Sequence, residues 1–193
     1  MYQKGNKRLI VLSLYNGEYS AKLYLREISR LSGLPLKTTQ NTVSELENEN
    51  ILKSSTEGKN KYFMLNLDNI QTKFYMEHSE LNKTAEFTEK YMSFKTFLKE
   101  GKNLDNPIMV FGSFAKLEAT EDSDLDLFII SNKKISLPYH LLPYKIHEII
   151  LSEDNFFKGI KSGETLIKEV IKNHVILNNH SFFINVMWGK HAK

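Results

Sequence analysis

The sequence predicts an α+β protein in which helices and a small hairpin precede a part built around buried strands. Apolar residues recur at helical spacing over 7–49 and 69–101, whereas short apolar runs typical of strands appear further on at 108–111, 124–130 and 146–151. The 193 residues, 41% apolar and 25% charged, allow one or two domains with packed cores.

Three helices are expected near the N-terminus, at residues 7–14, 25–31 and 37–49. The second has apolar residues at three-residue spacing, so they share one face. Pro35 suits the start of the third helix, and Asn50 stands at its end, where a left-handed residue is favoured. Short strands are expected around them at 21–24, 51–55 and 61–67.

This order resembles a winged helix-turn-helix domain, as found in many prokaryotic transcription regulators, over roughly residues 5–68. The resemblance is closest over residues 25–34, which read LREISRLSGL. It implies duplex DNA as a partner, read by the third helix and held by lysines of the wing. The expected DNA-binding residues are Lys37, Thr38, Gln40, Asn41, Lys59 and Lys61. The alternative is a winged helix used only for dimerisation or protein contacts.

The charge is uneven along the chain. Residues 1–70 hold 10 Lys and Arg against 7 Asp and Glu, whereas residues 71–193 hold 16 of each, so the net charge of +3 lies in the N-terminal part. This modest excess does not by itself establish a nucleic-acid partner. The chain has no cysteine, which excludes disulfides and thiolate chemistry and fits a cytoplasmic protein. No apolar run has the length of a membrane span, so no membrane partner is expected.

An aromatic stripe marks the segment 69–101, which is expected to be helical. Its residues recur at positions i, i+4, i+7 and i+11, and they are Phe87, Tyr91, Phe94 and Leu98. A stripe at this spacing indicates a packed core.

The most informative stretch is 110–130, which reads VFGSFAKLEATEDSDLDLFII. It predicts a strand, a Gly-Ser turn, a loop or short helix, and a second strand. Asp124 and Asp126 are two residues apart and therefore share one face of that strand. Their charges repel each other unless a cation lies between them, and Mg²⁺ prefers such oxygen ligands. Gly112 and Ser113 follow an apolar strand, where backbone N–H groups can meet an anion.

This pattern of Gly-Ser, a ten-residue spacer and Asp-x-Asp resembles the nucleotidyltransferase superfamily that includes DNA polymerase β. The resemblance implies transfer of a nucleoside monophosphate from an NTP, with ATP as the first candidate and Mg²⁺ or Mn²⁺ as cofactor. Asp124 and Asp126 would be the catalytic metal ligands, and Gly112, Ser113 and Lys116 would bind the nucleotide. The sequence departs from the family at Leu117, where relatives commonly have a second glycine.

A third strand is expected at residues 146–151. In the superfamily such a strand carries a third carboxylate, which takes the proton of the acceptor hydroxyl or completes a metal site. Glu148 is the only acid in this strand, so it is the candidate catalytic base, with a solvated glutamate as the alternative. His147 is interpreted as an ordinary surface or core histidine.

The last part of the chain is predicted to be mainly helical. Glu153 and Asp154 suit the first turn of a helix, and residues 164–177 form a second amphipathic pattern. Residues 181–188 are expected to form a short closing strand or helix.

The predicted architecture has three parts: a winged helix-turn-helix at 1–68, a helical connection at 69–101 and a nucleotidyltransferase domain at 102–193. The last is expected to hold a small mixed sheet flanked by helices. The expected partners are a nucleoside triphosphate and duplex DNA, with a protein partner and a homodimer left open.

Three other functions are compatible with the same motifs. The first is a DNA-binding regulator whose transferase domain senses nucleotide or is inactive. The second is an enzyme that modifies a protein partner, because the motif also resembles antitoxins that add AMP to a partner toxin. The third is a small-molecule transferase resembling aminoglycoside nucleotidyltransferases.

Overall fold

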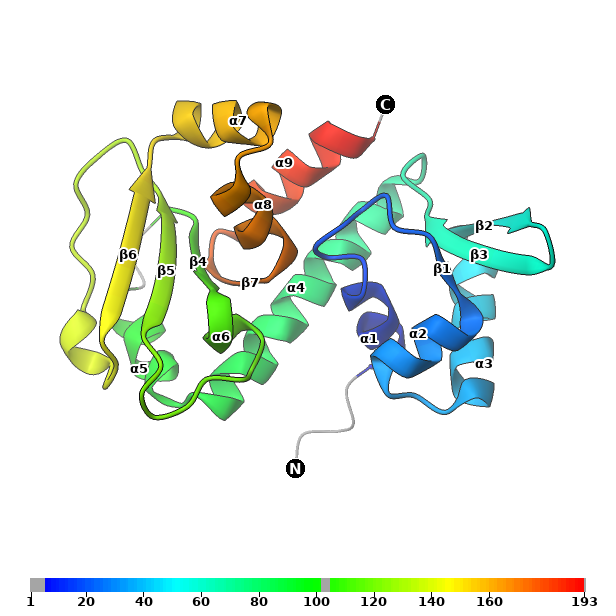
Figure 1. Cartoon of the computed structure of the whole chain (residues 1–193), viewed down its shortest axis with the longest axis horizontal. Helices are drawn as coiled ribbons and strands as arrows, with labels where there is room; N and C mark the ends of the chain where they lie inside the picture. The colour runs from blue at the N-terminus through cyan, green and yellow to red at the C-terminus, as the bar shows by residue number, and fades with distance from the viewer. Residues whose placement is uncertain (1–5, 102–104, 193) are drawn as a thin grey trace. The chain divides into compact units, whose positions relative to one another are not determined.

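The computed structural model describes residues 6–101 and 105–192, and its elements are labelled in Figure 1. Contacts between residues divide the chain into two units. The first unit contains residues 1–82 and 184–193, and the second contains residues 83–183. The helices α4 (Ile70–Lys90) and α9 (His180–His191) each contribute to both units. None of the described helices is both long and apolar enough to cross a membrane.

The first unit begins with three helices, α1 (Lys7–Ser13), α2 (Leu25–Ser32) and α3 (Leu36–Asn48). Asn6 caps α1 by accepting a hydrogen bond from the backbone N–H of Arg8 at 3.1 Å. Gly33 ends α2 and Asn50 follows α3, both in the left-handed conformation, as expected for Asn50. The buried face of α3 holds Val43 and Leu46.

A three-stranded antiparallel sheet completes the first unit. Its strands are β1 (Leu23–Tyr24), β2 (Leu52–Glu57) and β3 (Asn60–Leu65), and β3 lies in the middle. Phe63 and Leu65 of β3 are buried on one face, and the hydroxyl of Tyr15 donates to the carbonyl of Phe63 at 3.1 Å. Burial raises the pKa of Tyr15 well above its usual value.

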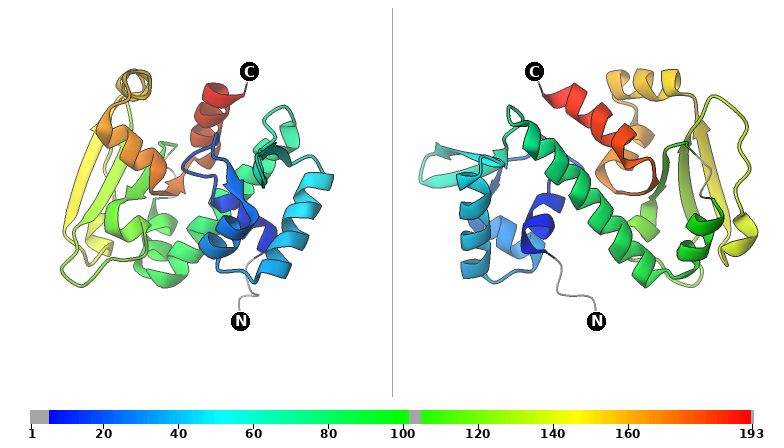
Figure 2. Two further views of the ribbon diagram at one scale, coloured as in Figure 1. Left: turned by 45° about the vertical axis from the view of Figure 1, so that its right-hand side comes forward. Right: turned by 180° about the vertical axis from the view of Figure 1, so that it is seen from behind.

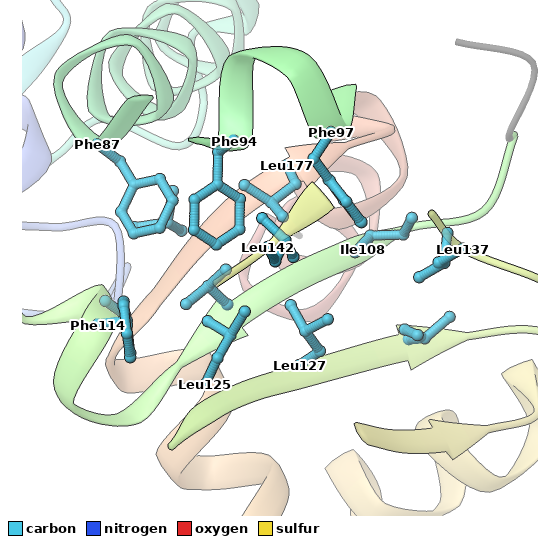
Figure 3. Packing of buried hydrophobic residues seen from close by; sticks show 14 residues of the cluster. Phe87, Phe94, Phe97, Ile108, Phe114, Leu125, Leu127, Leu137, Leu142 and Leu177 are labelled. Atoms are coloured by element: carbon cyan, nitrogen blue, oxygen red, sulfur yellow. The ribbon is translucent and has the colours of Figure 1, made fainter. Parts of the chain in front are cut away.

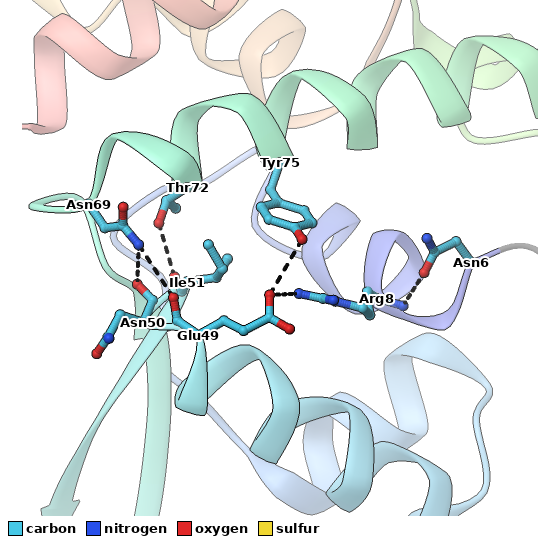
Figure 4. A network of polar contacts seen from close by, with 8 residues as sticks. All are labelled: Asn6, Arg8, Glu49, Asn50, Ile51, Asn69, Thr72 and Tyr75. Carbon is cyan, nitrogen blue, oxygen red and sulfur yellow. Dashed lines mark hydrogen bonds and ion pairs between the residues drawn. The ribbon is translucent and has the colours of Figure 1, made fainter.

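A network of polar contacts joins α1, the end of α3 and the start of α4 (Figure 4). The Glu49 carboxylate accepts hydrogen bonds from the Arg8 guanidinium and from the Tyr75 hydroxyl. Thr72 of α4 donates to the carbonyl of Ile51 at 3.3 Å. The hydrogen bond from Arg8 lowers the pKa of Glu49 below its usual value.

The helical connection is two helices rather than one. α4 ends at Lys90, and α5 (Ser93–Glu100) follows after a two-residue break. The aromatic stripe spans this break, and Phe87 and Phe94 are both fully buried. The expected packing role of the stripe is therefore confirmed.

The second unit is built on a four-stranded mixed sheet. Its strands are β4 (Ile108–Phe111), β5 (Leu125–Ile130), β6 (Ile146–Leu151) and β7 (His174–Asn178), in the order β6-β5-β4-β7. β4 is antiparallel to both β5 and β7, whereas β5 and β6 are parallel. The predicted strand at 146–151 is confirmed with the expected bounds.

One face of this sheet carries the apolar core shown in Figure 3. Leu125, Leu127 and Ile129 of β5 pack there with aromatic side chains of α4 and α5. The short helix η1 (Tyr139–Leu141) lies in the segment between β5 and β6 that also contributes Leu137 and Leu142 to this core. Because side chains alternate along a strand, Asp126 and Phe128 point to the opposite face.

The second face is covered by helices that follow β6. α7 (Glu153–Ser162) is capped by Ser152 and lies at the carboxyl end of β5 and β6 (Figure 2). The prediction of one helix over 164–177 is wrong, because α8 (Thr165–Lys172) ends early and the remainder forms β7. β7 pairs with β4 with one irregularity between Ile108 and Met109, so the backbone of this segment makes sheet hydrogen bonds instead of helical ones.

Candidate active site

The Gly-Ser turn lies where β4 ends. Gly112 opens the short helix α6 (Gly112–Ala115) in the left-handed conformation, with φ of 69°. A Cβ atom on Gly112 would lie 2.4 Å from Oδ2 of Asp126. Glycine is favoured here for two reasons, since the backbone is left-handed and the neighbouring carboxylate occupies the space of a side chain.

The two aspartates stand at the start of β5. Asp126 pairs with Phe111, the last residue of β4, which brings its carboxylate beside the Gly-Ser turn. Asp124 immediately precedes the strand. Their side chains are 28% exposed for Asp126 and 45% exposed for Asp124, so the site is open to solvent. The structure thus brings together the turn and the acid pair that the sequence singled out.

A basic side chain contacts each aspartate from the neighbouring strand. His147 pairs with Asp126 in the parallel register, and its Nδ1 lies 3.2 Å from Oδ1 of Asp126. Lys145 directly precedes β6 and extends its pairing with β5, because the carbonyl of Lys145 accepts a hydrogen bond from the N–H of Leu125 at 2.8 Å. The Nζ atom of Lys145 lies 2.9 Å from Oδ2 of Asp124. The contacts of both basic residues were missed in the sequence, because they depend on the register of β5 against β6.

Glu148 lies on the other face of the sheet. It pairs with Leu127, a core residue, and side chains in register on parallel strands point to the same face. Its carboxylate accepts a hydrogen bond from the Tyr139 hydroxyl. Burial and this hydrogen bond raise the pKa of Tyr139 above its usual value. The structure does not bring Glu148 to the aspartates. The position beside Asp126 that the sequence assigned to Glu148 is occupied by His147.

Ser113 and Lys116 flank the turn in different environments. Ser113 is half-buried in α6, whereas Lys116 is exposed just after it. Leu117 adopts the left-handed conformation with φ of 61°, so the turn expected of a glycine forms with leucine in its place. The Lys90 ammonium donates to the carbonyl of Leu117, which adds another cation near the turn.

The aspartate pair suits a divalent metal in its donor atoms. Two carboxylates on one face offer the oxygen ligands that Mg²⁺ and Mn²⁺ prefer, and the missing side chain of Gly112 lets the Asp126 carboxylate lie against the turn. Across residues 6–101 and 105–192, no group of three or more His, Cys, Asp or Glu side chains is arranged to hold a metal ion. Any metal here would therefore take its remaining ligands from the nucleotide, from water or from a side chain that turns towards it.

The residues expected to bind DNA lie in the first unit and on two sides of α3. Gln40 lines a groove of about 700 Å³ between α3 and the β2–β3 hairpin, together with Arg26, Ser44, Lys59 and Lys61. Thr38 and Asn41 line a separate hollow of about 460 Å³ beside α1. Lys37 is exposed near the start of α3. Gln40 therefore lies on a different side of α3 from Thr38 and Asn41.

Lys61 differs from the other expected DNA contacts because it already has an anionic partner. Its ammonium lies 2.8 Å from Oε2 of Glu47, whose other oxygen accepts from Ser54. Partial burial raises the pKa of Glu47, but the hydrogen bonds from Lys61 and Ser54 outweigh it and hold that pKa below its usual value. Lys59 lies one residue after the left-handed Gly58, in the turn of the hairpin, and is exposed.

Comparison with known families places this site in a wider group of proteins. Residues 93–182 match the family model described as polymerase beta, nucleotidyltransferase. Comparisons of the chain with curated proteins and with solved structures give no significant match. The matched segment contains the Gly-Ser turn, both aspartates and the strand of His147. Residues 93–182 therefore carry a nucleotidyltransferase domain of the polymerase β type.

Proposed function

We propose that the chain transfers a nucleoside monophosphate from a nucleoside triphosphate, with ATP as the first candidate, to an acceptor hydroxyl. The observation that carries this proposal is the contact between the Gly-Ser turn and the acid pair. Gly112 adopts a backbone conformation that favours glycine, and the carboxylate of Asp126 fills the space that a side chain would take. A packing role alone would not require the turn and the carboxylate to meet.

In this reaction the acceptor oxygen attacks the α-phosphorus, the bond from that phosphorus to the pyrophosphate oxygen breaks, and the hydroxyl proton passes to solvent water. Asp124 and Asp126 would hold a divalent metal, which supplies positive charge to the phosphates and to the leaving pyrophosphate. The backbone and hydroxyl of Ser113 would hold the terminal phosphates, and Lys116 would approach them from solvent. The contribution of the protein is mainly to position these groups.

The test is to incubate the protein with labelled ATP, GTP, CTP or UTP, Mg²⁺ and a cell lysate. We expect a labelled acceptor with the wild type and roughly a hundredfold less label with Asp126→Asn, on the scale of a lost catalytic group. Glu148→Gln is the matched control, because the same change on the opposite face of the sheet should leave labelling unchanged. A lysate in which wild type and Asp126→Asn label nothing would refute the transferase and favour a nucleotide sensor.

The labelled species also identifies the acceptor class. Label in a protein would support an enzyme that modifies a protein partner. Label in nucleic acid or in a small molecule would instead support a transferase that acts on that class of acceptor. A hundredfold loss of labelling in Glu148→Gln would indicate that Glu148 is the catalytic base after all.

We infer a second function, DNA binding by the first unit as a winged helix. The supporting observation is the groove between α3 and the hairpin, whose lining includes Arg26, Gln40, Ser44 and Lys59 beside the Lys61–Glu47 pair. All four of these side chains can contact phosphates, and each can also hydrogen-bond to base edges in the major groove. An α-helix next to a basic hairpin fits the major groove with the wing against the backbone.

Lys59→Ala is expected to weaken binding to duplex DNA at every sequence and to lower the salt dependence, log K against log salt, by about one unit. Lys61→Ala should have a smaller effect, because Glu47 already neutralises that ammonium. Gln40→Ala should alter sequence preference instead. Fluorescence anisotropy over a salt series measures all three.

Lys53→Ala is the control for this series. Its ammonium pairs with Asp68 at 3.2 Å and does not line the groove. Equal losses in Lys53→Ala and Lys59→Ala would mean that net charge rather than the groove binds DNA, and no duplex binding at low salt would remove the proposal.

A further inference from the structure

His147 and Asp126 are joined by a hydrogen bond whose length is close to the separation of two adjacent ligands on one metal ion. Their Nδ1 and Oδ1 atoms lie 3.2 Å apart and point to the same face of two adjacent strands. Imidazole nitrogen and carboxylate oxygen each bind metals at about 2.0–2.2 Å, so two such ligands at a right angle are about 3 Å apart. The observed separation therefore leaves room for one ion to replace the hydrogen bond.

The parallel register explains why a histidine and not an acid occupies this place. Asp126 is opposite His147, and Leu127 is opposite Glu148, so the only acid of β6 is turned into the other face. His147 is 63% exposed and lies on the outer strand of the sheet, where its ring is free to rotate towards an ion. Its neighbour Lys145 offers no lone pair while it is protonated and cannot serve as the third ligand.

We propose that His147 is a metal ligand together with Asp124 and Asp126, giving a site of two carboxylates and one imidazole. This inference rests on the proposed function, because it concerns the metal that the nucleotidyl transfer would use. The three side chains are not gathered around one point in the structure, since the carboxylate of Asp124 is turned to Lys145. A metal ion would replace Lys145 as the partner of the Asp124 carboxylate, which would then turn towards Asp126 and His147.

The chemical consequence is a change of metal preference. Mg²⁺ binds oxygen ligands and holds its water tightly, whereas first-row transition ions accept imidazole nitrogen readily. A site with three carboxylates favours Mg²⁺, and replacing one of them by imidazole moves the preference towards Mn²⁺. His147 would therefore make this transferase domain a manganese-preferring one.

The test uses Mn²⁺ and Mg²⁺ with the full chain and needs no turnover. Electron spin echo envelope modulation of bound Mn²⁺ detects a directly coordinated imidazole nitrogen, and isothermal titration gives the affinity for each ion. We expect the nitrogen signal in the wild type and in His140→Ala, which removes another exposed histidine of the same unit. The signal should vanish in His147→Asp, and the ratio of Mn²⁺ to Mg²⁺ affinity should fall at least about tenfold, the lower scale for losing a partner of a bound metal.

The outcomes separate this inference from the proposed function. Mn²⁺ that binds the wild type without a nitrogen signal, and binds His147→Asp with the same preference, would show that His147 only hydrogen-bonds to Asp126. Asp124→Asn with Asp126→Asn is the second arm, because it removes the carboxylates and keeps the imidazole. If that double variant binds both ions as the wild type does, the metal lies elsewhere and the proposed function fails with it.

Discussion

Asp124→Asn combined with Asp126→Asn is expected to abolish the rise in melting temperature that Mg²⁺ and a nucleoside triphosphate give the wild type. A ligand bound only by the native state stabilises it by about 2.7 kcal/mol at a hundredfold excess over Kd. For a chain of this size that corresponds to on the order of 5–10 °C. The double variant should lose this rise because it removes both negative charges that attract the metal.

The double variant should still fold. Both side chains are partly exposed, and the Lys145 that pairs with Asp124 is 83% exposed, so little stability depends on these contacts. Glu121→Gln with Asp122→Asn is the matched control, since it removes two exposed charges from the loop just before β5. Differential scanning fluorimetry compares the three proteins, and a full response in the Asp124 and Asp126 variant would place the nucleotide site elsewhere.

Gly112→Ala is expected to reduce nucleotidyl transfer by about a hundredfold, the scale for displacing a reacting group by an ångström. The new methyl group would collide with Oδ2 of Asp126, which can move only by rotating the carboxylate out of place. The left-handed backbone adds strain of about 1–2 kcal/mol. The loss should therefore appear in transfer and in the metal-dependent rise of the melting temperature more than in the stability of the protein without metal.

Gly163→Ala separates backbone strain from displacement of the carboxylate. Gly163 has φ of 71° at the end of α7, and a Cβ atom there would meet only the end of the Lys168 side chain. The two alanine variants should be destabilised alike, while Gly163→Ala keeps its activity. Equal loss of transfer in both would mean that strain in the unit, and not the position of Asp126, controls catalysis.

The acid pair and the turn could be predicted because their relation is local in the sequence. Gly112 directly follows β4 and Asp126 lies in β5, and one connection joins the two strands, so their antiparallel pairing returns the second strand to the end of the first. The residue of β6 that faces Asp126 could not be predicted in the same way. Whether His147 or Glu148 faces Asp126 depends on the register of β6, and a shift of one residue exchanges the two faces.

The strand β7 shows a second limit of sequence patterns. The run HVILN has apolar side chains that fit the inner face of a helix as well as a buried strand, and its length does not decide between them. Pairing with β4 decides it, and β4 is more than sixty residues away in the sequence. Lys61 shows the same limit at the surface, because only the folded hairpin brings its ammonium to Glu47.

The outer position of β6 makes occupancy of the site and order of that strand interdependent. Within the described residues β6 is hydrogen-bonded to β5 alone, so one side of its backbone has no strand partner. Edge segments of this kind open locally at a lower free energy than central strands. An ion held by Asp126 and His147 would join the two strands a second time through their side chains. Thermodynamic coupling then works in both directions: binding suppresses fraying of the edge, and fraying of the edge weakens binding.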